Sequence, residues 1–381
     1  MSNLFPTYSR WEIEPEWAEG SYLYGKDGKK YLDFTSGIGV NNLGHRPKVV
    51  QEAIQEQLDK FWHVSNLFPV ELQEIAAGKL APAAGMDLVF FCNSGAEANE
   101  AAIKLARKAT GRKKIITFNQ SFHGRTYATM SATGQDKIKK GFGPMLETFT
   151  YVPFNDLKAL ESEMNDEVAA VMLEVIQGEG GIFPATEEFL HGIEALCKQH
   201  GSLLILDEIQ TGIGRTGKPF AFQHFDLKPD IVSVAKGLGN GLPIGAIIGR
   251  KELKDVFGPG SHGTTFGGNP LSVASSIATM NMIFDEEFLT EVNKKAEFLK
   301  INLKKNLSSL TNVKDIRGLG FMIGIEVTEG VSEILKSLRI SGIIVLSAGE
   351  NVVRLLPPLT ATIEEIRTGI EIITNVLSER N

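Results

Sequence analysis

Three polar segments follow three separate apolar runs of the chain, and their residue types could do chemistry together. Asp207 follows the run SLLIL, Lys236 lies two residues beyond IVSV, and Gly95 opens a helical stretch after LVFFC. A carboxylate can hold a cationic nitrogen, and an amine can form an imine with an aldehyde. The N–H groups at a helix start can bind an anion. Each residue alone has an ordinary explanation as a cap, a turn or a solvated side chain.

One small molecule needs all three partners at once. Pyridoxal 5′-phosphate (PLP) carries a phosphate, a pyridine nitrogen and an aldehyde. Residues 94–96 would bind the phosphate through backbone N–H groups and a serine hydroxyl. Asp207 would keep the pyridine nitrogen protonated, and Lys236 would bond to the aldehyde. The neighbouring Gly237 is expected to leave room for this cofactor.

The strands that must position these residues are apolar throughout. The candidate strands are Leu88–Cys92, Lys114–Phe118, Val168–Val175, Ser202–Leu206, Ile231–Val234 and Ala246–Gly249. Continuous apolar runs are typical of parallel strands covered on both faces, and amphipathic stretches such as 96–110 and 187–200 lie between them. The middle of the chain therefore predicts an open α/β sheet, with a ligand site at the carboxyl ends of its strands.

The order of the patterns predicts two domains. Residues 46–272 form the large PLP-binding domain with a mostly parallel sheet, and residues 273–381 form a smaller α+β domain. The helical region 270–310 leads into that smaller domain. Residues 1–45 contain the hairpin 20–34 and are expected to pack with it.

Composition argues against several classes of function. The net charge is −7 with no basic tract, so no nucleic-acid partner is expected. No apolar run approaches the roughly 18 residues of a membrane span, and no signal-peptide pattern opens the chain. The two cysteines fit reduced thiols, so a cytoplasmic location is expected. The seven histidines lack ligand spacing, so no metal site is predicted. The segment 212–218 resembles a phosphate-binding loop, but Pro219 stands where Ser or Thr would bind Mg²⁺.

Six motifs along nearly the whole chain resemble those of the class III aminotransferases, fold type I PLP enzymes that act on ω-amino groups. These motifs are NSGAEANEAAIKLAR, FHGRT, EVIQGEGG, LDEIQTGIGRTG, AKGLGNGLPIGA and TTFGGNPL. The segments DFTSGIGVNNLGH and FWHVSNLF, with the short length, look most like the branch that acts on N2-acetylornithine.

The resemblance implies a reaction and leaves some donors open. The implied reaction moves the δ-amino group of N2-acetylornithine to 2-oxoglutarate. The products would be N-acetylglutamate 5-semialdehyde and glutamate, as in arginine biosynthesis. Ornithine, succinylornithine and 4-aminobutyrate remain alternative donors, and a glutamate-semialdehyde aminomutase is a more remote alternative.

The resemblance also implies roles for residues around the cofactor, with Lys236 and Asp207 as the catalytic pair. The cofactor-binding residues would be Ser94, Gly95, Ala96, Phe122, Asp207, Ile209, Gln210, Lys236 and Thr265. Phe122 and Ile209 would cover the two faces of the ring, and Gln210 would bond near its 3′-oxygen. Thr265 would reach the phosphate of a neighbouring subunit, which implies a homodimer with shared active sites.

Four further residues would bind substrate, namely Arg125, Thr264, Glu179 and Arg354. Arg125 would hold a substrate carboxylate, and Thr264 would contact the substrate. Arg354 would bind the α-carboxylate of glutamate, and Glu179 would cover Arg354 while an ω-amino donor is bound. Gly39 stands where the family often has alanine, a change that bears on substrate shape.

Overall fold

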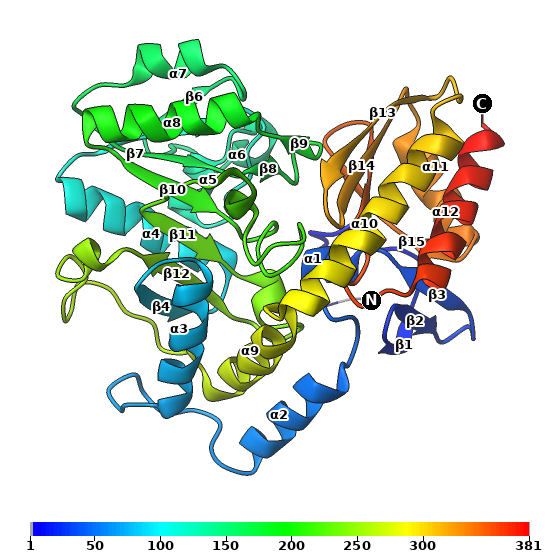
Figure 1. The fold of residues 1–381 in the computed structure, drawn as a ribbon, viewed down its shortest axis with the longest axis horizontal. Coiled ribbons are helices and arrows are strands. Elements are labelled where there is room, and N and C mark those ends of the chain that lie inside the picture. The colour runs from blue at the N-terminus through cyan, green and yellow to red at the C-terminus, as the bar shows by residue number, and fades with distance from the viewer. Residues whose placement is uncertain (1–2, 381) are drawn as a thin grey trace.

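The computed structural model describes residues 3–380, which form a large α/β lobe and a smaller lobe side by side (Figure 1). The large lobe is built on a seven-stranded sheet. In spatial order its strands are β4 (Leu88–Cys92), β12 (Gly245–Gly249), β11 (Ile231–Val234), β10 (Leu203–Asp207), β7 (Val168–Leu173), β5 (Lys114–Phe118) and β6 (Phe149–Val152). The predicted α/β sheet is confirmed.

The sheet is mostly parallel, with one exception that the sequence did not reveal. Strands β11, β10, β7, β5 and β6 run parallel to one another, whereas β12 is antiparallel to both β11 and β4. An apolar run reports burial on both faces and carries no information about direction. The short edge strand β6 was not predicted at all. Because β12 reverses direction between them, β4 and β11 still point the same way.

Helices cover both faces of the sheet and separate two apolar cores. On one face, α4 (Gly95–Thr110) packs with Ile205 and Met172. On the other face, α8 (Glu187–His200) packs with Leu206 and Val171. This alternation follows from the two-residue period of a strand. Both helices have capped starts and a glycine in the left-handed region at their carboxyl ends.

The smaller lobe is an antiparallel sheet with three helices. Its strands, in order, are β13 (Val313–Leu319), β14 (Met322–Val327), β17 (Val352–Leu355) and β16 (Leu346–Ala348). Its helices are α10 (Glu286–Leu307), α11 (Val331–Ile340) and α12 (Ile363–Ser378). The predicted helical region 270–310 is two helices, because α9 (Pro270–Ile283) ends before Phe284 and Asp285 caps the start of α10.

The N-terminal strands lie against the C-terminal lobe (Figure 1). Strands β1 (Pro15–Glu19), β2 (Tyr22–Gly25) and β3 (Lys30–Asp33) form a sheet with β15 (Ile343–Ile344), which pairs parallel with β3. This pairing supports the predicted packing of the first segment with the small domain. The domain boundaries at residues 45 and 272 stay a prediction.

The remaining elements connect these layers. They are α1 (Ser36–Gly39), α2 (Lys48–Leu58), α3 (Glu71–Ala83), α5 (Tyr127–Ala132), α6 (Asp136–Lys139), α7 (Leu157–Glu163), β8 (Ile176–Gln177), β9 (Phe183–Pro184) and 3₁₀ turns at Ala221–Phe225, Lys236–Leu238 and Lys251–Leu253. Helix α9 packs on α2 and α3. Within residues 3–380, every helix is too short or too polar to cross a bilayer.

Candidate active site

The carboxyl ends of β4, β7, β10 and β11 meet around a cavity of about 470 Å³. Ten of the residues that the sequence predicts for the site line this cavity: Ser94, Gly95, Ala96, Phe122, Arg125, Glu179, Asp207, Ile209, Gln210 and Lys236. Thr264, Thr265 and Arg354 do not line it. The cavity therefore brings together the acid, the amine and the helix start that the sequence places far apart.

Asp207 ends β10 and is almost fully buried, with both carboxylate oxygens engaged. Its Oδ2 accepts hydrogen bonds from Asn99 Nδ2 and from His123 Nδ1, each at 2.8 Å, and Oδ1 accepts from the Ile209 N–H at 3.1 Å. Asn99 is itself fixed because its Oδ1 accepts from the Ser233 hydroxyl at 2.6 Å. Three donors from three segments thus set the position of one carboxylate at the cavity wall.

Lys236 lies just beyond β11 with a φ of 46°, in the left-handed region that a non-glycine residue rarely adopts. Burial lowers the pKa of its amine. The positive charge of Arg354 acts in the same direction, while the carboxylates of Glu179 and Asp207 partly oppose it. A lowered pKa increases the share of neutral amine, which is the nucleophilic form. A strained backbone and a lowered pKa are both typical of functional residues, so they support the prediction made for this lysine.

The glycine after this lysine does not serve the purpose expected from the sequence. A Cβ at Gly237 would clash with the side-chain amide of Asn42, so the missing side chain makes room for the N-terminal segment. Asn42 in turn accepts from the fully buried Arg215 at 2.6 Å. Arg215 also donates to the carbonyls of Phe321 and Pro357 in the smaller lobe. The glycine-rich segment 212–218 therefore has a structural role in joining the lobes.

The first turn of α4 forms an anion cradle at the cavity. A Cβ at Gly95 would lie 2.7 Å from Ile209 Cδ1, so only glycine allows this close approach. The first N–H groups of a helix have no acceptor within the helix, and those of Gly95 and Ala96 stand at the cavity wall. Ser94 caps the helix by accepting from the Glu97 N–H at 3.2 Å, which leaves its hydroxyl hydrogen able to donate.

Arg354 reaches the site from the smaller lobe through an ion pair. Its Nη1 lies 2.5 Å from Glu179 Oε1, 3.0 Å from Gln210 Oε1 and 3.2 Å from the Gly178 carbonyl. Burial opposes ionisation of Glu179, but the charges of Arg354 and Lys236 hold its pKa below the usual range. Glu179 and Gln210 line the cavity, and Arg354, which is bonded to both, does not.

The other predicted substrate residues lie at or beyond the rim. Arg125 is exposed, with its guanidinium carbon 5.9 Å from the centre of the Phe122 ring. Thr264 Oγ1 accepts from Asn93 Nδ2 at 3.2 Å, and Asn93 lines the cavity. Thr265 is exposed. The roles of these residues stay predictions.

Sequence reasoning missed three buried polar residues around the cavity. His123 and Asn99 hold Asp207, and Glu174, which directly follows β7, lines the wall. Burial raises the pKa of Glu174 to about 7, with the charge of His123 opposing and that of Asp207 adding to the shift. The signals were present. Asn99 lies on the apolar side of the amphipathic stretch 96–110, and His123 lies inside the motif FHGRT.

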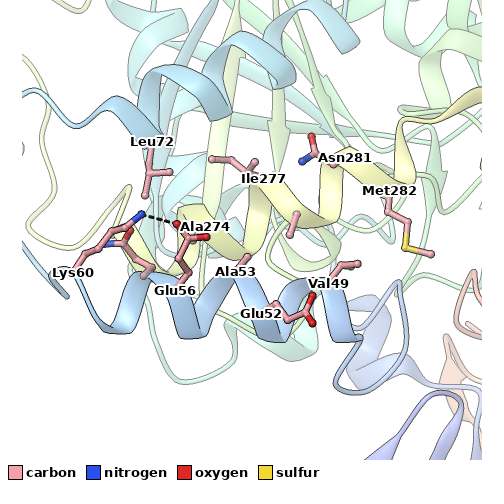
Figure 2. Close-up of a pocket in the computed structure, with 12 residues that line it drawn as sticks. Val49, Glu52, Ala53, Glu56, Lys60, Leu72, Ala274, Ile277, Asn281 and Met282 are labelled. Carbon is pink, nitrogen blue, oxygen red and sulfur yellow. Dashed lines mark hydrogen bonds and ion pairs between the residues drawn. The ribbon is translucent and has the colours of Figure 1, made fainter.

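A second hollow, of about 560 Å³, lies between α2 and α9 (Figure 2). Leu72 and Ile277 give it apolar walls, and an ion pair of 2.7 Å joins Lys60 and Glu56 on its α2 side. Its two acidic residues, Glu52 and Glu56, are both exposed, so we assign the chemistry to the first cavity. Within residues 3–380, no three His, Cys, Asp or Glu side chains are grouped so as to hold a metal.

The residues of the first cavity fit PLP. Gly95 lets the start of α4 approach Ile209, where an added Cβ would clash, and the N–H groups of this helix start suit a phosphate. His123 Nε2 is buried and has no partner within residues 3–380. The other ring nitrogen, Nδ1, bonds Asp207 Oδ2 at 2.8 Å. Asp207 and Lys236 supply the carboxylate and the amine that the ring and aldehyde require.

Comparisons with known proteins agree with this site. The family model "Aminotransferase class-III" matches residues 7–377. Acetylornithine aminotransferase of Bacillus subtilis (strain 168) is 59% identical over 97% of this chain and 96% of its own length. Acetylornithine aminotransferase of Streptococcus mutans is 52% identical over the full length of both chains.

Solved structures show the same architecture. Ornithine aminotransferase from Toxoplasma gondii ME49 superposes with a TM-score of 0.95 at 31% identity, covering 99% of this chain and 93% of its own. N-acetylornithine aminotransferase from Stenotrophomonas maltophilia K279a has a TM-score of 0.86 at 34% identity, covering 98% and 97%. The chain is an enzyme of the fold that its motifs predict, and it belongs to the class III aminotransferases.

Proposed function

We propose that this enzyme transfers the δ-amino group of N2-acetylornithine to 2-oxoglutarate. The products are N-acetylglutamate 5-semialdehyde and glutamate, and the reaction belongs to arginine biosynthesis. The observation that carries the proposal is the 59% identity, over nearly the full length of both chains, to an acetylornithine aminotransferase. The cofactor is PLP, as in class III aminotransferases generally.

Residues of the large lobe would hold the cofactor. The N–H groups of Gly95 and Ala96 and the hydroxyl of Ser94 bind the phosphate at the positive end of α4. Phe122 and Ile209, which both line the cavity, would cover the two faces of the ring. Gln210 already donates one amide hydrogen to Glu179, and the second remains for the 3′-oxygen.

The proton chemistry falls to two residues. When bound, PLP carries the amino group between substrates and absorbs the electrons of the broken C–H bond. Lys236 holds the cofactor between turnovers, and its lowered pKa suits Nζ to take a proton from the amino-bearing carbon of the donor. The Asp207 carboxylate, fixed by His123 and Asn99, keeps a proton on the ring nitrogen.

The same cavity must accept two different donors. N2-acetylornithine presents a δ-amine with no carboxylate beside it, whereas glutamate presents an α-amine next to a carboxylate. The Glu179–Arg354 pair, closed at 2.5 Å, neutralises the arginine for the first donor. When the pair opens, the freed guanidinium binds the α-carboxylate of glutamate. Arg125, at the rim, and Thr264 contact the distal part of the substrate.

A homodimer with shared active sites is part of the proposal. Exposed apolar side chains gather in the segment 61–68 and at Phe266, where Trp62, Leu67 and Phe266 are 64%, 91% and 59% exposed. Asn66 Nδ2 bonds the Thr264 carbonyl at 3.2 Å, so this surface adjoins Thr265. A large exposed apolar patch is typical of an interface. A protein that is monomeric in solution by light scattering would contradict this part.

A cytoplasmic location remains our expectation. It rests on the cysteines, since Cys92 and Cys197 are both unpaired and buried. Disulfides are rare in reducing compartments.

Ornithine is the second candidate donor, because an ornithine aminotransferase superposes with a TM-score of 0.95. Its identity is only 31%, against 59% for the acetylornithine enzyme. A donor panel with 2-oxoglutarate as acceptor separates the two. We expect the highest kcat/KM with N2-acetylornithine. Equal or higher kcat/KM with free ornithine would overturn the acetyl preference, and turnover without any 2-oxo acid would favour an aminomutase.

A further inference from the structure

Glu174 is a buried carboxylate at the cavity wall that has no part in the reaction described so far. It directly follows β7 and is 6% exposed. Its Oε1 accepts from the Phe122 N–H at 3.0 Å, and its Oε2 accepts from the Gly178 N–H at 3.1 Å. One carboxylate therefore ties together two loops, one following β5 and one following β8.

Each of these loops carries a residue of the proposed site. Phe122 lines the cavity beside the position of the ring. Gly178 immediately precedes Glu179, and both its carbonyl and the Glu179 carboxylate accept from Arg354. The space around Gly178 is tight, because an added Cβ would clash with the amide of Gln210. A shift of the Gly178 backbone would therefore move two acceptors of Arg354, the Gly178 carbonyl and the Glu179 carboxylate.

The site is also an unfavourable one for a carboxylate. Burial raises the pKa of Glu174 to about 7, and the neighbouring Asp207 adds to the shift. A packing role alone would be served by an apolar side chain of similar volume. The two backbone donors explain why an acceptor with two oxygens is placed here.

We infer that Glu174 is a positioning residue that holds the Glu179–Arg354 pair closed by fixing the Gly178 N–H relative to Phe122. The inference rests on the proposed function, in which the pair is closed for the ω-amino donor and open for glutamate. Loss of the restraint favours the open pair. The reaction with glutamate should then suffer less than the reaction with N2-acetylornithine.

The chain offers a matched control in Glu208. This carboxylate is also fully buried, and burial raises its pKa to about 7. Its oxygens likewise accept from two backbone N–H groups, those of Ala221 and Phe222, at 3.0 and 2.8 Å. Glu208 does not line the cavity. Its replacement disturbs a buried carboxylate of the same kind but leaves the Phe122 and Gly178 N–H groups untouched, because its oxygens face Ala221 and Phe222 instead.

The test compares Glu174→Gln with Glu208→Gln as holoenzymes. Glutamine keeps one carbonyl acceptor but turns an amide N–H toward the second backbone donor. Single-turnover rates with N2-acetylornithine and with glutamate are read separately from the cofactor absorbance. We divide the rate with N2-acetylornithine by the rate with glutamate. We expect this ratio to fall about tenfold in Glu174→Gln, which is the effect of one lost charge-assisted hydrogen bond. The ratio in Glu208→Gln should stay within about twofold of wild type.

Hydrogen exchange gives a readout that does not depend on activity. Peptides containing Phe122 and Gly178 should exchange faster in Glu174→Gln, and the same peptides should be unchanged in Glu208→Gln. If Glu174→Gln does not fold, Glu174→Asp replaces it, because a shorter carboxylate can reach only one of the two loops. The same fall in the ratio is expected from it.

One result would overturn the inference: a ratio in the Glu174 variant equal to that of wild type, whether both rates are unchanged or both fall by the same factor. It would show that Glu174 supports the fold without biasing the pair. Failure of the proposed function looks different, because the wild-type enzyme itself would then not react with N2-acetylornithine.

Discussion

The two walls of the cavity are built in different ways. On the wall formed by the large lobe, Asp207 is held by Asn99 and His123, and all three belong to the layers of one sheet. On the wall that contains Glu179, the support comes from Arg354 of the smaller lobe, which lies behind the lining and forms an ion pair with Glu179 of the large lobe. The first wall is held by residues of the large lobe alone, whereas the second depends on contacts between the two lobes.

This difference matches two tasks, because the first wall would serve the proton chemistry and the second would distinguish between the two amino donors. The proton on the ring nitrogen is needed in both half-reactions, and a carboxylate with three donors is suited to a constant task. The carboxylate beside the reacting amine is present in only one substrate, and a pair formed between two units can open. Substitutions on the first wall should therefore affect both half-reactions alike, and substitutions on the second should affect them unequally.

The largest effect is expected from Asp207→Asn. The new amide cannot accept from all three donors and cannot stabilise a protonated ring nitrogen, so both half-reactions should slow by roughly 10²–10³-fold or more. Asp230→Asn is the control, because Asp230 accepts from the Leu204 N–H at the amino ends of the strands, away from the cavity. Stopped-flow rates with each donor measure the effect. Loss confined to one donor would contradict the assignment of Asp207 to the fixed wall.

A smaller and one-sided effect is expected from Arg354→Lys. Lysine keeps the charge but loses the planar fork that binds a carboxylate through two hydrogen bonds. The KM for glutamate and 2-oxoglutarate should rise about 10–100-fold, while kcat/KM for N2-acetylornithine changes much less. Arg317→Lys is the control, since Arg317 pairs with Glu326 on the adjacent strand of the same sheet. Equal loss for both substrates would remove the proposed role of the second wall.

The last effect is on the stability of the fold and on neither half-reaction. Burial raises the pKa of Glu208 from 4.5 to about 7. The folded state therefore binds more protons between these values, and this residue's contribution to stability falls as pH rises through that window. Glu208→Gln stays neutral and should reduce the fall, by roughly 3 kcal/mol at most. Thermal unfolding of wild type and variant at pH 5 and pH 7.5 measures this. If the variant lost more stability than wild type between pH 5 and pH 7.5, the expected direction of the pH dependence would be wrong.

The sequence predicted the first wall better than the second. Asp207, Lys236 and Gly95 each lie next to an apolar strand, and strand ends converge by a general rule of α/β sheets. Their convergence could be predicted from the order of the elements alone. The meeting of Glu179 with Arg354 came only from the family resemblance, because the packing of two lobes leaves no local pattern.

The residues that hold the site residues in place could not be assigned a role from their own positions in the sequence. Asn99, His123 and Glu174 act on their neighbours through hydrogen bonds over 108, 84 and 52 positions of the chain. Strand direction was similarly hidden, since β12 is as apolar as its parallel neighbours. Gly237 was predicted to make room for the cofactor, but an added Cβ there would clash with Asn42. A glycine in the sequence indicates a close approach without identifying the residue that approaches.

The most direct test is chemical trapping at Lys236. The purified holoenzyme is treated with borohydride, which makes an imine bond permanent, and its peptides are then mapped by mass spectrometry. The account predicts one modified lysine, Lys236, and no modification in Lys236→Ala, which should also lack transamination. A cofactor attached to another lysine in an active enzyme, or normal turnover by Lys236→Ala, would contradict it.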